Sequence, residues 1–467
     1  METIVLYPTF GMGHLISMVE LGKFILRRQP SLSITVLTMP PPFGSGSTAD
    51  YISHISATVP SITFHHLPAV SLDQLDAFPS IEAILFEALD RHNPHVLRAL
   101  ETVSASAAVS AFVIDFFCTA ALPIAAKLGI RTYYFLTSGA HFTSLLLHLP
   151  KLDRTTTQSF KDMKSTLLDV PGVPPVPASD MVRPLLDRTT SDYQNFLNVS
   201  NNMLDSAGIL INTFESLEPT PLAAIREGKC NHAGRAPPIF CVGPLLAAQD
   251  RDAGEHLCLK WLDKQPSKSV VYICFGSAGL VSAAQLKEMA EGLERSGHRF
   301  LWVVRSPPWE DKAKMFLPLP EPDLEALLSV GFLERTEERG LVVKGWAPQV
   351  AVLGHAAVGG FVTHCGWNSI LEAVCAGVPM ATWPLYAEQH FNRVVVVEGL
   401  GVAVGVEERE DGLVAAEEVE RRVREVMEDV SVRKLVEEKS AEAKAAMAEG
   451  GSSVAAMEML LDLWTSD

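Results

Sequence analysis

The feature that most constrains the fold is a block of buried strand, glycine-rich turn and amphipathic helix that occurs twice. The first block runs from Ile4–Tyr7 through a turn into the helical pattern Leu15–Arg28, and another strand, Ser33–Leu37, follows. The second block opens with the strand Ser269–Phe275 and the turn Gly276–Gly279. This order is typical of parallel sheets with crossover helices. We therefore predict an α/β protein with two doubly wound, Rossmann-like domains.

The chain length and one change in composition predict where these domains divide. At 467 residues, the chain is long enough for two or three domains. A Pro- and Gly-rich stretch from Gly234 to Pro244 precedes the polar run Gln249–Glu255, which is typical of a linker. We predict domains at 1–240 and 256–450, a linker at 241–255, and a C-terminal helix at 451–467 that packs back on the first domain. Because ligands of doubly wound sheets bind at the carboxyl ends of strands, we expect the reaction in a cleft that both domains face.

Two further segments have a readable pattern. The region Pro150–Arg188 is rich in Pro, Asp and Thr and lacks periodicity, so we interpret it as an irregular surface excursion that shapes a substrate mouth. A charged helix is expected from Ala415, with an apolar face. Additional strands are predicted at Ala111–Ile114, Phe300–Val304, Gly340–Val343, Gly359–Thr363 and Met380–Trp383.

Charge and cysteine content limit the class of protein. Asp and Glu outnumber Lys and Arg by 55 to 38, and the net charge of −17 argues against nucleic acids or anionic membranes as partners. The 7 cysteines form no Cys-x-x-Cys pair, which indicates buried thiols in a reducing compartment. A signal peptide begins with a positively charged region, but the first Lys or Arg of this chain is Lys23. The apolar stretch Ser104–Ala126 contains Asp115, and a charge there argues against a membrane span. We expect a monomeric cytoplasmic protein without a membrane span.

The most informative stretch runs from Trp346 to Gln389. At its centre the strand Gly359–Thr363 leads through His364–Ser369 into a helix expected from about Ile370. The backbone N–H groups of residues 366–369 then lie at a helix N-terminus, which favours phosphate. The stretch contains no Lys or Arg, so neutral donors would hold any anion, and the missing Walker lysine argues against phosphoryl transfer.

Each residue of this stretch also has a purely structural interpretation. Ser369 and Glu372 have the spacing of a helix capping box. His364 fits a buried structural histidine, and Trp346, Trp367 and Trp383 fit core aromatics. A separate motif, Asp250-Arg251-Asp252, matches the Asp-x-Asp of metal-dependent transferases. No adjacent apolar strand would orient its carboxylates toward a metal ion, so we predict no metal site or cofactor.

The complete stretch resembles the signature box of plant family 1 glycosyltransferases, which use UDP-sugars. Residues that fit the box are Trp346, Gln349, His364, Gly366, Trp367, Asn368, Ser369, Glu372, Glu388 and Gln389. The resemblance extends to Gly11–His14, Val113–Asp115, Trp261–Asp263 and Phe275–Ser277, and thus over essentially the whole chain. It implies the GT-B fold, with the acceptor on the N-terminal domain and the UDP-sugar on the C-terminal one. The opening Tyr7-Pro8 to Lys23 is most similar to enzymes that act on flavonoids, dihydrochalcones and related phenols.

The resemblance also implies roles for individual residues. Trp346 would stack on the uracil, with Ala347 and Gln349 beside the uridine, and Glu372 would bind the ribose. The diphosphate would be held by Ser277, His364, Gly366, Asn368 and Ser369. The sugar would be bound by Trp367, Glu388 and Gln389. Glutamine at the last position of the box is associated with glucose, where histidine would suggest galactose.

A catalytic pair is indicated by His14 and Asp115. His14 follows a strand and a glycine turn, and Asp115 ends another apolar strand of the same half. Imidazole can take a proton from a hydroxyl near neutral pH, and a carboxylate behind the ring would fix its tautomer. Together with the resemblance, this predicts a general base, His14, assisted by Asp115.

We therefore predict an inverting UDP-glycosyltransferase that transfers glucose to a hydroxyl of a small phenolic acceptor. Attack by a ring carbon, which gives a C-glucoside, stays open. A non-catalytic UDP-sugar binding protein is opposed by the presence of both His14 and Asp115. An epimerase or phosphorylase is opposed by the apolar first half, with Phe117, Phe135 and Phe142. A dehydrogenase is disfavoured because no Gly-x-Gly-x-x-Gly with a ribose-binding acid follows either opening strand.

Overall fold

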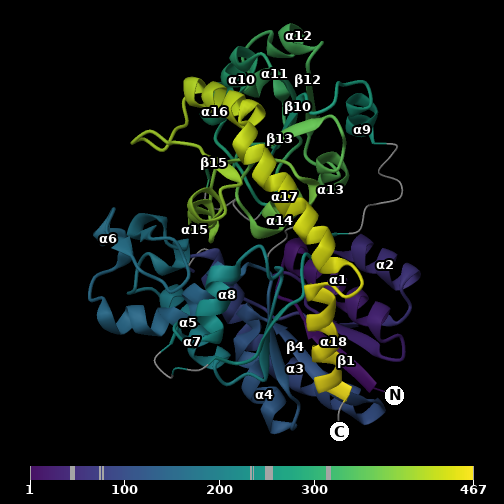
Figure 1. The fold of residues 1–467 in the computed structure, drawn as a ribbon. Helices are drawn as coiled ribbons and strands as arrows, with labels where there is room; N and C mark the ends of the chain where they lie inside the picture. The colour runs from purple at the N-terminus through teal and green to yellow at the C-terminus, as the bar shows by residue number, and fades with distance from the viewer. Residues whose placement is uncertain are drawn as a thin grey trace. The chain divides into compact units, whose positions relative to one another are not determined.

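The computed structural model describes residues 2–42, 48–72, 75, 78–231, 234, 236–247, 256–311 and 317–465, and the structural statements below concern these residues. The chain divides into two compact units, 1–247 with 445–467 and 248–444. Each unit is built around its own parallel sheet (Figure 1). The predicted α/β class with two doubly wound sheets is confirmed. Residues 248–255 of the predicted linker, including Asp250-Arg251-Asp252, lie outside the described residues.

The first unit contains a seven-stranded sheet in which every neighbouring pair is parallel. In sheet order its strands are β3 (Ile62–His66), β2 (Ser33–Thr38), β1 (Glu2–Tyr7), β4 (Ala108–Asp115), β5 (Thr132–Leu136), β8 (Gly208–Ile211) and β9 (Ile239–Cys241). From β1 the chain proceeds to β2 on one side, and β4 pairs on the other with Tyr7 beside Ile114. The carboxyl ends of β1 and β4 therefore form the switch point, where doubly wound sheets bind ligands.

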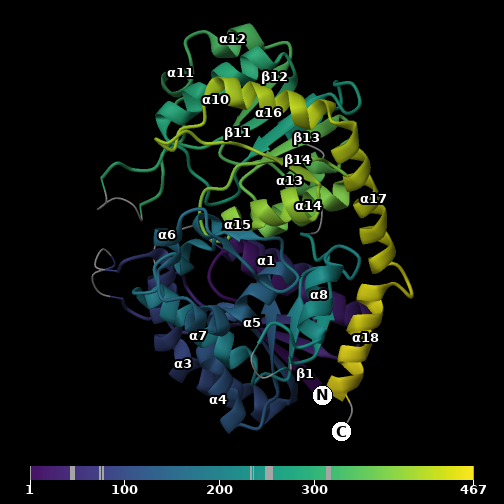
Figure 2. The ribbon, with the colours of Figure 1, turned by 60° about the vertical axis from the view of Figure 1, so that its left-hand side comes forward.

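Helices cover both faces of this sheet. They are α1 (Met12–Arg28), α2 (Ala49–Thr58), α3 (Ile81–Ser106), α4 (Leu122–Lys127), α5 (Ala140–Thr155), α7 (Ser191–Met203), α8 (Pro219–Arg226) and α18 (Ser452–Thr465). Helices α3 and α7 begin at a side-chain cap: the Ser80 hydroxyl accepts the N–H of Ala83 at 2.9 Å, and the Thr190 hydroxyl that of Tyr193 at 3.3 Å. Helix α7 packs between α3 and α5, as Figure 2 shows.

The last helix, α18, belongs to the core of the first unit. Val454, Met457 and Trp464 pack into the apolar cluster that β1 and α1 form, and the Trp464 ring meets Tyr133 edge-on at 5.5 Å. At the surface, Arg28 of α1 forms ion pairs with Glu449 and Glu458. Figure 1 shows α1 and α18 side by side.

The interpretation of Pro150–Arg188 as a surface excursion is wrong for much of its length. Helix α5 continues through Pro150 to Thr155, and short elements follow: α6 (Phe160–Met163), β6 (Leu167–Leu168), β7 (Val176–Pro177) and two 3₁₀ turns. The side chains of Leu168, Val176 and Leu185 are buried. These isolated apolar residues have no helical or strand period, so sequence patterning does not reveal their burial.

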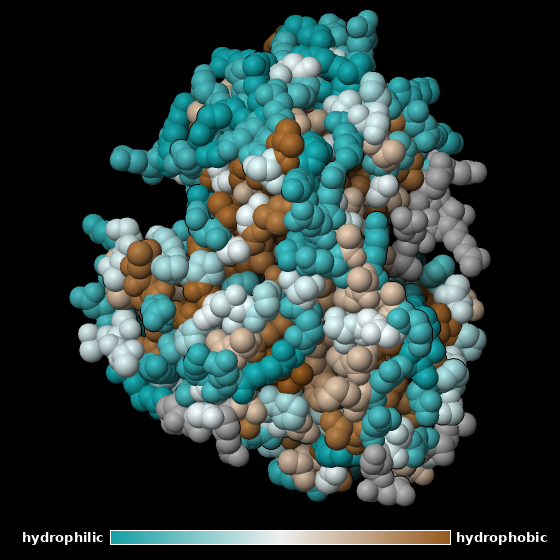
Figure 3. Space-filling view, in the orientation of Figure 1, coloured by the Kyte–Doolittle hydropathy of each residue, from teal (hydrophilic) through white to brown (hydrophobic). Residues whose placement is uncertain are grey.

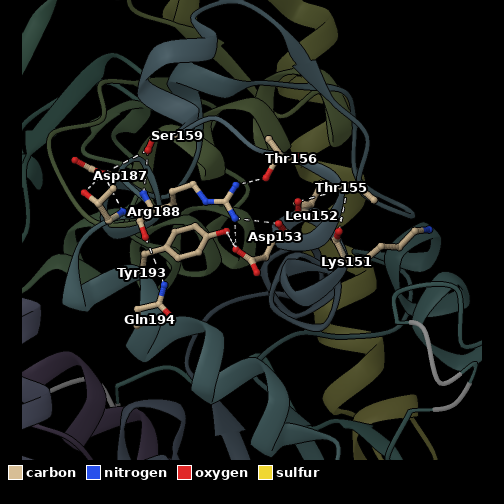
Figure 4. Close-up of polar contacts among 11 residues, drawn as sticks. Lys151, Leu152, Asp153, Thr155, Thr156, Ser159, Asp187, Arg188, Tyr193 and Gln194 are labelled. Carbon is tan, nitrogen blue, oxygen red and sulfur yellow. Dashed lines mark hydrogen bonds and ion pairs between the residues drawn. The ribbon is translucent and has the colours of Figure 1, made fainter.

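Arg188 fixes the end of this segment (Figure 4). Its guanidinium donates to the carboxylate of Asp153 at 2.7 Å and to the backbone carbonyls of Asp153 and Thr156, near the C-terminus of α5. The Tyr193 hydroxyl, on α7, donates to the same Asp153 oxygen at 3.0 Å. A cation at a helix C-terminus satisfies its last carbonyls. The Asp153 carboxylate of α5 therefore binds both Arg188 and the Tyr193 hydroxyl of α7.

The second unit contains a six-stranded parallel sheet. In sheet order its strands are β12 (Gly340–Lys344), β11 (Arg299–Val304), β10 (Val270–Cys274), β13 (Val358–Thr363), β14 (Met380–Thr382) and β15 (Ala403–Gly405). The strands predicted at Phe300–Val304, Gly340–Val343, Gly359–Thr363 and Met380–Trp383 are confirmed to within one or two residues. Here the switch point lies between β10 and β13.

The helices of the second unit surround this sheet. They are α9 (Leu257–Leu262), α10 (Ala283–Ser296), α11 (Leu324–Leu327), α12 (Phe332–Thr336), α13 (Gln349–Leu353), α14 (Trp367–Ala376), α15 (Gln389–Val394), α16 (Ala416–Glu428) and α17 (Val430–Met447). Val419, Val423 and Val426 of α16 are buried as predicted, while the surface over α16 is mostly hydrophilic (Figure 3). No helix in the described part of the chain is both long and apolar enough to cross a bilayer.

Candidate functional site

His14 and Asp115 lie together at the switch point of the first sheet. Asp115 ends β4, and His14 lies in the first turn of α1, which follows β1. His14 Nδ1 is 2.7 Å from Asp115 Oδ2. The other carboxylate oxygen of Asp115, which is fully buried, accepts the N–H of Phe117 at 3.1 Å. Both oxygens are held, so the carboxylate has one orientation behind the ring.

The contact with Asp115 fixes which nitrogen of His14 carries the proton. An ionised carboxylate only accepts hydrogen bonds, so Nδ1 must be the donor. In the neutral ring, Nε2 then carries the basic lone pair. The Thr137 hydroxyl lies 3.4 Å from Nδ1, on the same side as Asp115. The arrangement is that of a general base with an orienting carboxylate.

Phenylalanines form a wall beside this pair. The His14 ring centroid lies 5.9 Å from that of Phe117 and 6.4 Å from that of Phe116. Phe116 and Phe117 in turn contact a wider cluster made of Phe86 of α3, Phe142 of α5 and Phe196 of α7. Sequence reasoning singled out Phe117 and Phe142 but missed Phe116, their neighbour after β4, and also Phe86 and Phe196, which only the packing of α3 and α7 brings here. Such a wall suits a flat apolar ligand.

A second buried histidine–carboxylate pair has a structural explanation. Glu218 accepts the N–H groups of Ala140 and His141 at 2.8 and 3.0 Å, and its Oε1 lies 2.6 Å from His141 Nδ1. Burial raises the pKa of Glu218, but the hydrogen bonds from His141 outweigh it and hold the pKa below its usual value. Glu218 therefore caps α5 as a carboxylate.

In the second unit, the turn after β13 leads directly into α14. This helix begins at Trp367, three residues earlier than expected, with Gly366 as its N-cap and no side-chain cap. Ser369 and Glu372 consequently lie inside the helix, and the capping-box interpretation is wrong. Cys365 has a φ of 67°, which turns the chain sharply and brings the first N–H groups of α14 to the sheet edge.

Gln349, Ser369 and Glu372 form one hydrogen-bonded group. The Gln349 amide donates to the Ser369 hydroxyl at 2.9 Å and to the Glu372 carboxylate at 2.7 Å. Burial raises the pKa of Glu372 to about 7, and the hydrogen bond from Gln349 opposes this shift. The group therefore offers a carboxylate and an amide that neighbouring elements already orient.

His364 is buried between two glycine turns. A Cβ on Gly276 would lie 2.6 Å from its Cε1, and one on Gly366 would lie 2.6 Å from its Nε2, so both positions require glycine. Burial lowers the pKa of His364 to about 4, so the ring is neutral at pH 7. Its buried Nδ1 forms no hydrogen bond with any described residue. A neutral imidazole can donate to an anion but brings no charge.

The three tryptophans of the box differ in exposure. Trp346, just after β12, has 63% of its surface exposed, and its ring is edge-on to His256 at 5.8 Å. Trp367 is only 3% exposed, and Trp383 packs on Phe275 in the core. The core interpretation thus holds for Trp367 and Trp383 but is wrong for Trp346. Ala347 beside it is buried.

The loop after β14 carries Glu388 and Gln389. Gln389 is buried, and its amide oxygen accepts the N–H groups of Leu385 and Tyr386 at 2.8 and 3.0 Å. Glu388 directly precedes α15 and is partly exposed. Asn392, which sequence reasoning missed, donates to the carbonyl of Cys365 at 2.9 Å and lies 3.4 Å from Glu388 Oε1. Its amide thus connects the two loops.

Comparison with known proteins identifies the family. A family model described as UDP-glucoronosyl and UDP-glucosyl transferase matches residues 238–441. UDP-glycosyltransferase 88B1 of Stevia rebaudiana is 48% identical over 463 residues, which cover 99% of this chain and 98% of that protein. The chain belongs to the plant family 1 UDP-glycosyltransferases.

Two further relatives of this UDP-glycosyltransferase extend the comparison. Phloretin 2'-O-glucosyltransferase of Malus domestica is 50% identical over 475 residues, 97% of each chain. The structure of Phytolacca americana UGT2 complexed with UDP-2fluoro-glucose and pterostilbene matches with a TM-score of 0.89 at 36% identity, and covers 100% of both chains. The enzyme is therefore a UDP-glycosyltransferase of the hexosyltransferase class with GT-B structural neighbours.

The structure of the UDP-glycosyltransferase gathers the predicted residues into two groups. Those of the donor box, with Ser277, follow the carboxyl ends of β10, β12, β13 and β14 in the second unit. Asn368 lies in the first turn of α14, partly exposed, and Ser277 is exposed just after β10. His14 and Asp115 form the other group, in the first unit. The assignment of roles within each group stays a prediction.

Proposed function

We propose that this UDP-glycosyltransferase transfers glucose from UDP-glucose to a hydroxyl of a phenolic or flavonoid acceptor, with inversion at the anomeric carbon. The observation that carries the proposal is the 2.7 Å contact between His14 Nδ1 and Asp115 Oδ2 beside a phenylalanine wall. The acceptor class is supported by relatives named for phloretin and by the neighbour solved with pterostilbene.

His14 acts as the general base in this proposal. Its Nε2 takes the proton of the acceptor hydroxyl, while Asp115 stabilises the imidazolium that forms. The acceptor oxygen then attacks the anomeric carbon from the face opposite UDP, and the bond from that carbon to the β-phosphate oxygen breaks. UDP leaves with the electron pair, and an α-linked donor gives a β-glycoside. Positioned proton transfer of this kind contributes about 10²–10⁴-fold in rate.

The second unit binds the donor in this proposal. The exposed ring of Trp346 stacks on the uracil, and the Glu372 carboxylate, oriented by the Gln349 amide, accepts hydrogen bonds from the ribose hydroxyls. The N–H groups that begin α14, with the Ser369 hydroxyl and the neutral His364, hold the diphosphate. Glu388 and Gln389 bind the sugar hydroxyls, and the backbone contacts of the Gln389 oxygen orient its amide for this task.

One experiment tests the reaction and distinguishes O- from C-glucosylation. The purified protein is incubated with UDP-glucose, UDP-galactose or UDP-xylose and a panel of phenols that includes phloretin, and products are identified by mass and acid lability. We expect an acid-labile β-glucoside, formed fastest from UDP-glucose. An acid-stable product would instead indicate attack by a ring carbon. Binding of UDP-sugar with no product from any acceptor would contradict the proposal and favour a binding protein.

A further inference from the structure

Arg305 lies beside the predicted diphosphate site, although it is outside the donor box. It directly follows β11, whose parallel pairing with β10 sets Trp302 opposite Ile273 and brings the carboxyl ends of both strands together. From this position the Arg305 guanidinium donates to the backbone carbonyl of Ser277 at 2.5 Å. Arg305 and Gly276 also line the same hollow at the sheet edge.

The charge of Arg305 has no carboxylate partner among the described residues. Some partly buried arginines of the chain do: Arg188 binds Asp153 and Arg422 binds Glu418, each at 2.7 Å. Arg433 instead donates to two backbone carbonyls, whereas the one described acceptor of Arg305 is the Ser277 carbonyl. Burial lowers the pKa of the Arg305 guanidinium, whereas bound carboxylates raise the pKa of Arg226 and Arg335. A guanidinium has five N–H donors, and among the described residues only the Ser277 carbonyl accepts from Arg305, so its surroundings suit an anion that comes from outside the chain.

Two neighbours place Arg305 against the same group of loops as His364. Burial raises the pKa of Tyr386, which lies in the loop that carries Glu388, and the positive charge of Arg305 opposes this rise. The Tyr386 ring lies 6.2 Å from that of His364, which in turn packs on Gly276, one residue before Ser277. His364 is neutral at pH 7 and the box lacks Lys and Arg, so the positive charge near these loops comes from outside the box: from Arg305, and from Arg393 of α15, whose charge opposes the rise that burial causes in the pKa of Cys365.

We propose that Arg305 is a positioning residue for the diphosphate of the nucleotide donor: it holds the Ser277 turn in place and supplies the positive charge that the box lacks. This inference rests on the proposed function, because it assigns the diphosphate to that turn. In a chain with a net charge of −17, one cation at the site offsets the surrounding negative potential for a ligand that carries its charge on two phosphates.

The test separates the phosphates of the ligand from its nucleoside. Dissociation constants for UDP and for uridine are measured on the full chain by calorimetry, at low and high salt. Arg305→Gln and Arg305→Met remove the charge, and the second retains the apolar stem in case the first does not fold. Arg305→Lys keeps the charge. Arg299→Gln is the matched control, because Arg299 begins the same strand and donates to Gln265.

We expect both charge-free variants to bind UDP about tenfold more weakly, with uridine unaffected. The loss should shrink at high salt, and Arg305→Lys should recover part of the affinity. The KM for UDP-glucose should rise with little change in the KM for the acceptor. The control should bind like the unaltered protein.

Two outcomes overturn the inference. Equal loss of UDP and uridine affinity would show that Arg305 only supports the fold, and unchanged UDP affinity would show that its charge is not used. Failure of the unaltered protein to bind UDP is a different result, since it contradicts the proposed function itself.

Discussion

The ends of the two sheets place different chemical groups at the same position in the fold. At the end of the seven-stranded sheet, between β1 and β4, a histidine and a fully buried carboxylate form a hydrogen-bonded pair among phenylalanines. At the end of the six-stranded sheet, between β10 and β13, the closest groups are backbone N–H donors, an amide and an imidazole that burial keeps neutral.

This difference separates two roles: the topology of the sheet decides where a site lies, and the residues after the strands decide which chemical groups the site contains. In both sheets the strand order reverses at the point where the groups gather, so topology alone selects the location. The residues that follow the strands then make one end suited to proton transfer and the other to holding an anion. Substitutions at the two ends should therefore separate into effects on the chemical step and effects on donor binding.

The largest expected effect is on the proton-transfer end. Replacing His14 with alanine removes the proposed base, so we expect kcat to fall by about a hundredfold or more. Affinity for UDP should stay the same. Turnover of a phenol and calorimetry with UDP measure the two quantities. His54→Ala, an exposed histidine of α2 in the same unit, is the matched control. Full turnover by the His14 variant would remove the base from the mechanism.

Asp115→Asn keeps the shape of the side chain but removes its charge. The amide no longer enforces the proton on Nδ1 and no longer stabilises the imidazolium, so kcat should fall by about ten- to a hundredfold. UDP binding should again be unaffected. Asp162→Asn, at an exposed site of α6, controls for the loss of a carboxylate. If kcat falls no more than in this control, Asp115 does not orient His14.

On the donor-binding end, Trp346→Ala should weaken UDP binding by about tenfold, because stacking on the base is lost. Since Trp346 is 63% exposed, its removal should barely change the melting temperature. Trp346→Phe, which keeps an aromatic face, should recover most of the affinity. Equal UDP affinity of the alanine variant and the unaltered protein would contradict a uracil platform.

The smallest effect is a pH dependence of nucleoside binding. Burial raises the pKa of Glu372 to about 7, so the carboxylate that we propose as the acceptor for the ribose hydroxyls forms only as the pH rises through this value. Uridine affinity should therefore increase about threefold between about pH 6 and pH 8. Uridine serves as the probe because it has no phosphate that titrates in this range. The dependence should vanish in Glu372→Gln, and a profile that persists in that variant would assign it to another group.

Several buried strands were predictable, because uninterrupted apolar runs such as those in β1, β10 and β13 are typical of parallel strands. The sequence analysis did not identify β3, β5, β8, β9 or β15, although β5 is fully buried. The runs of β8, β9 and β15 are too short to show a period, and only pairing with a neighbouring strand defines them.

The residues of the candidate site also divide into those that a sequence pattern marks and those that only the folded structure reveals. His14, Asp115 and the box residues stand out because strand ends and a long motif mark them. Asn392 carries no local signal that separates it from other helical residues. Arg305 carries a weak one, since an arginine directly after the apolar strand Phe300–Val304 lies at a strand's carboxyl end, but the sequence analysis did not use it. The contact of Asn392 with Cys365 arises only from the folded loops.

The packing of α18 against the first unit determines the order in which the parts of this enzyme complete their folding during synthesis. A ribosome makes β1 to β9 long before it makes Trp464, whose ring covers Tyr133 in the finished core. While the second unit is being translated, α18 does not yet exist, so the apolar surface of the first unit that it covers stays exposed and can bind chaperones. The half of the molecule that is synthesised first is therefore completed last.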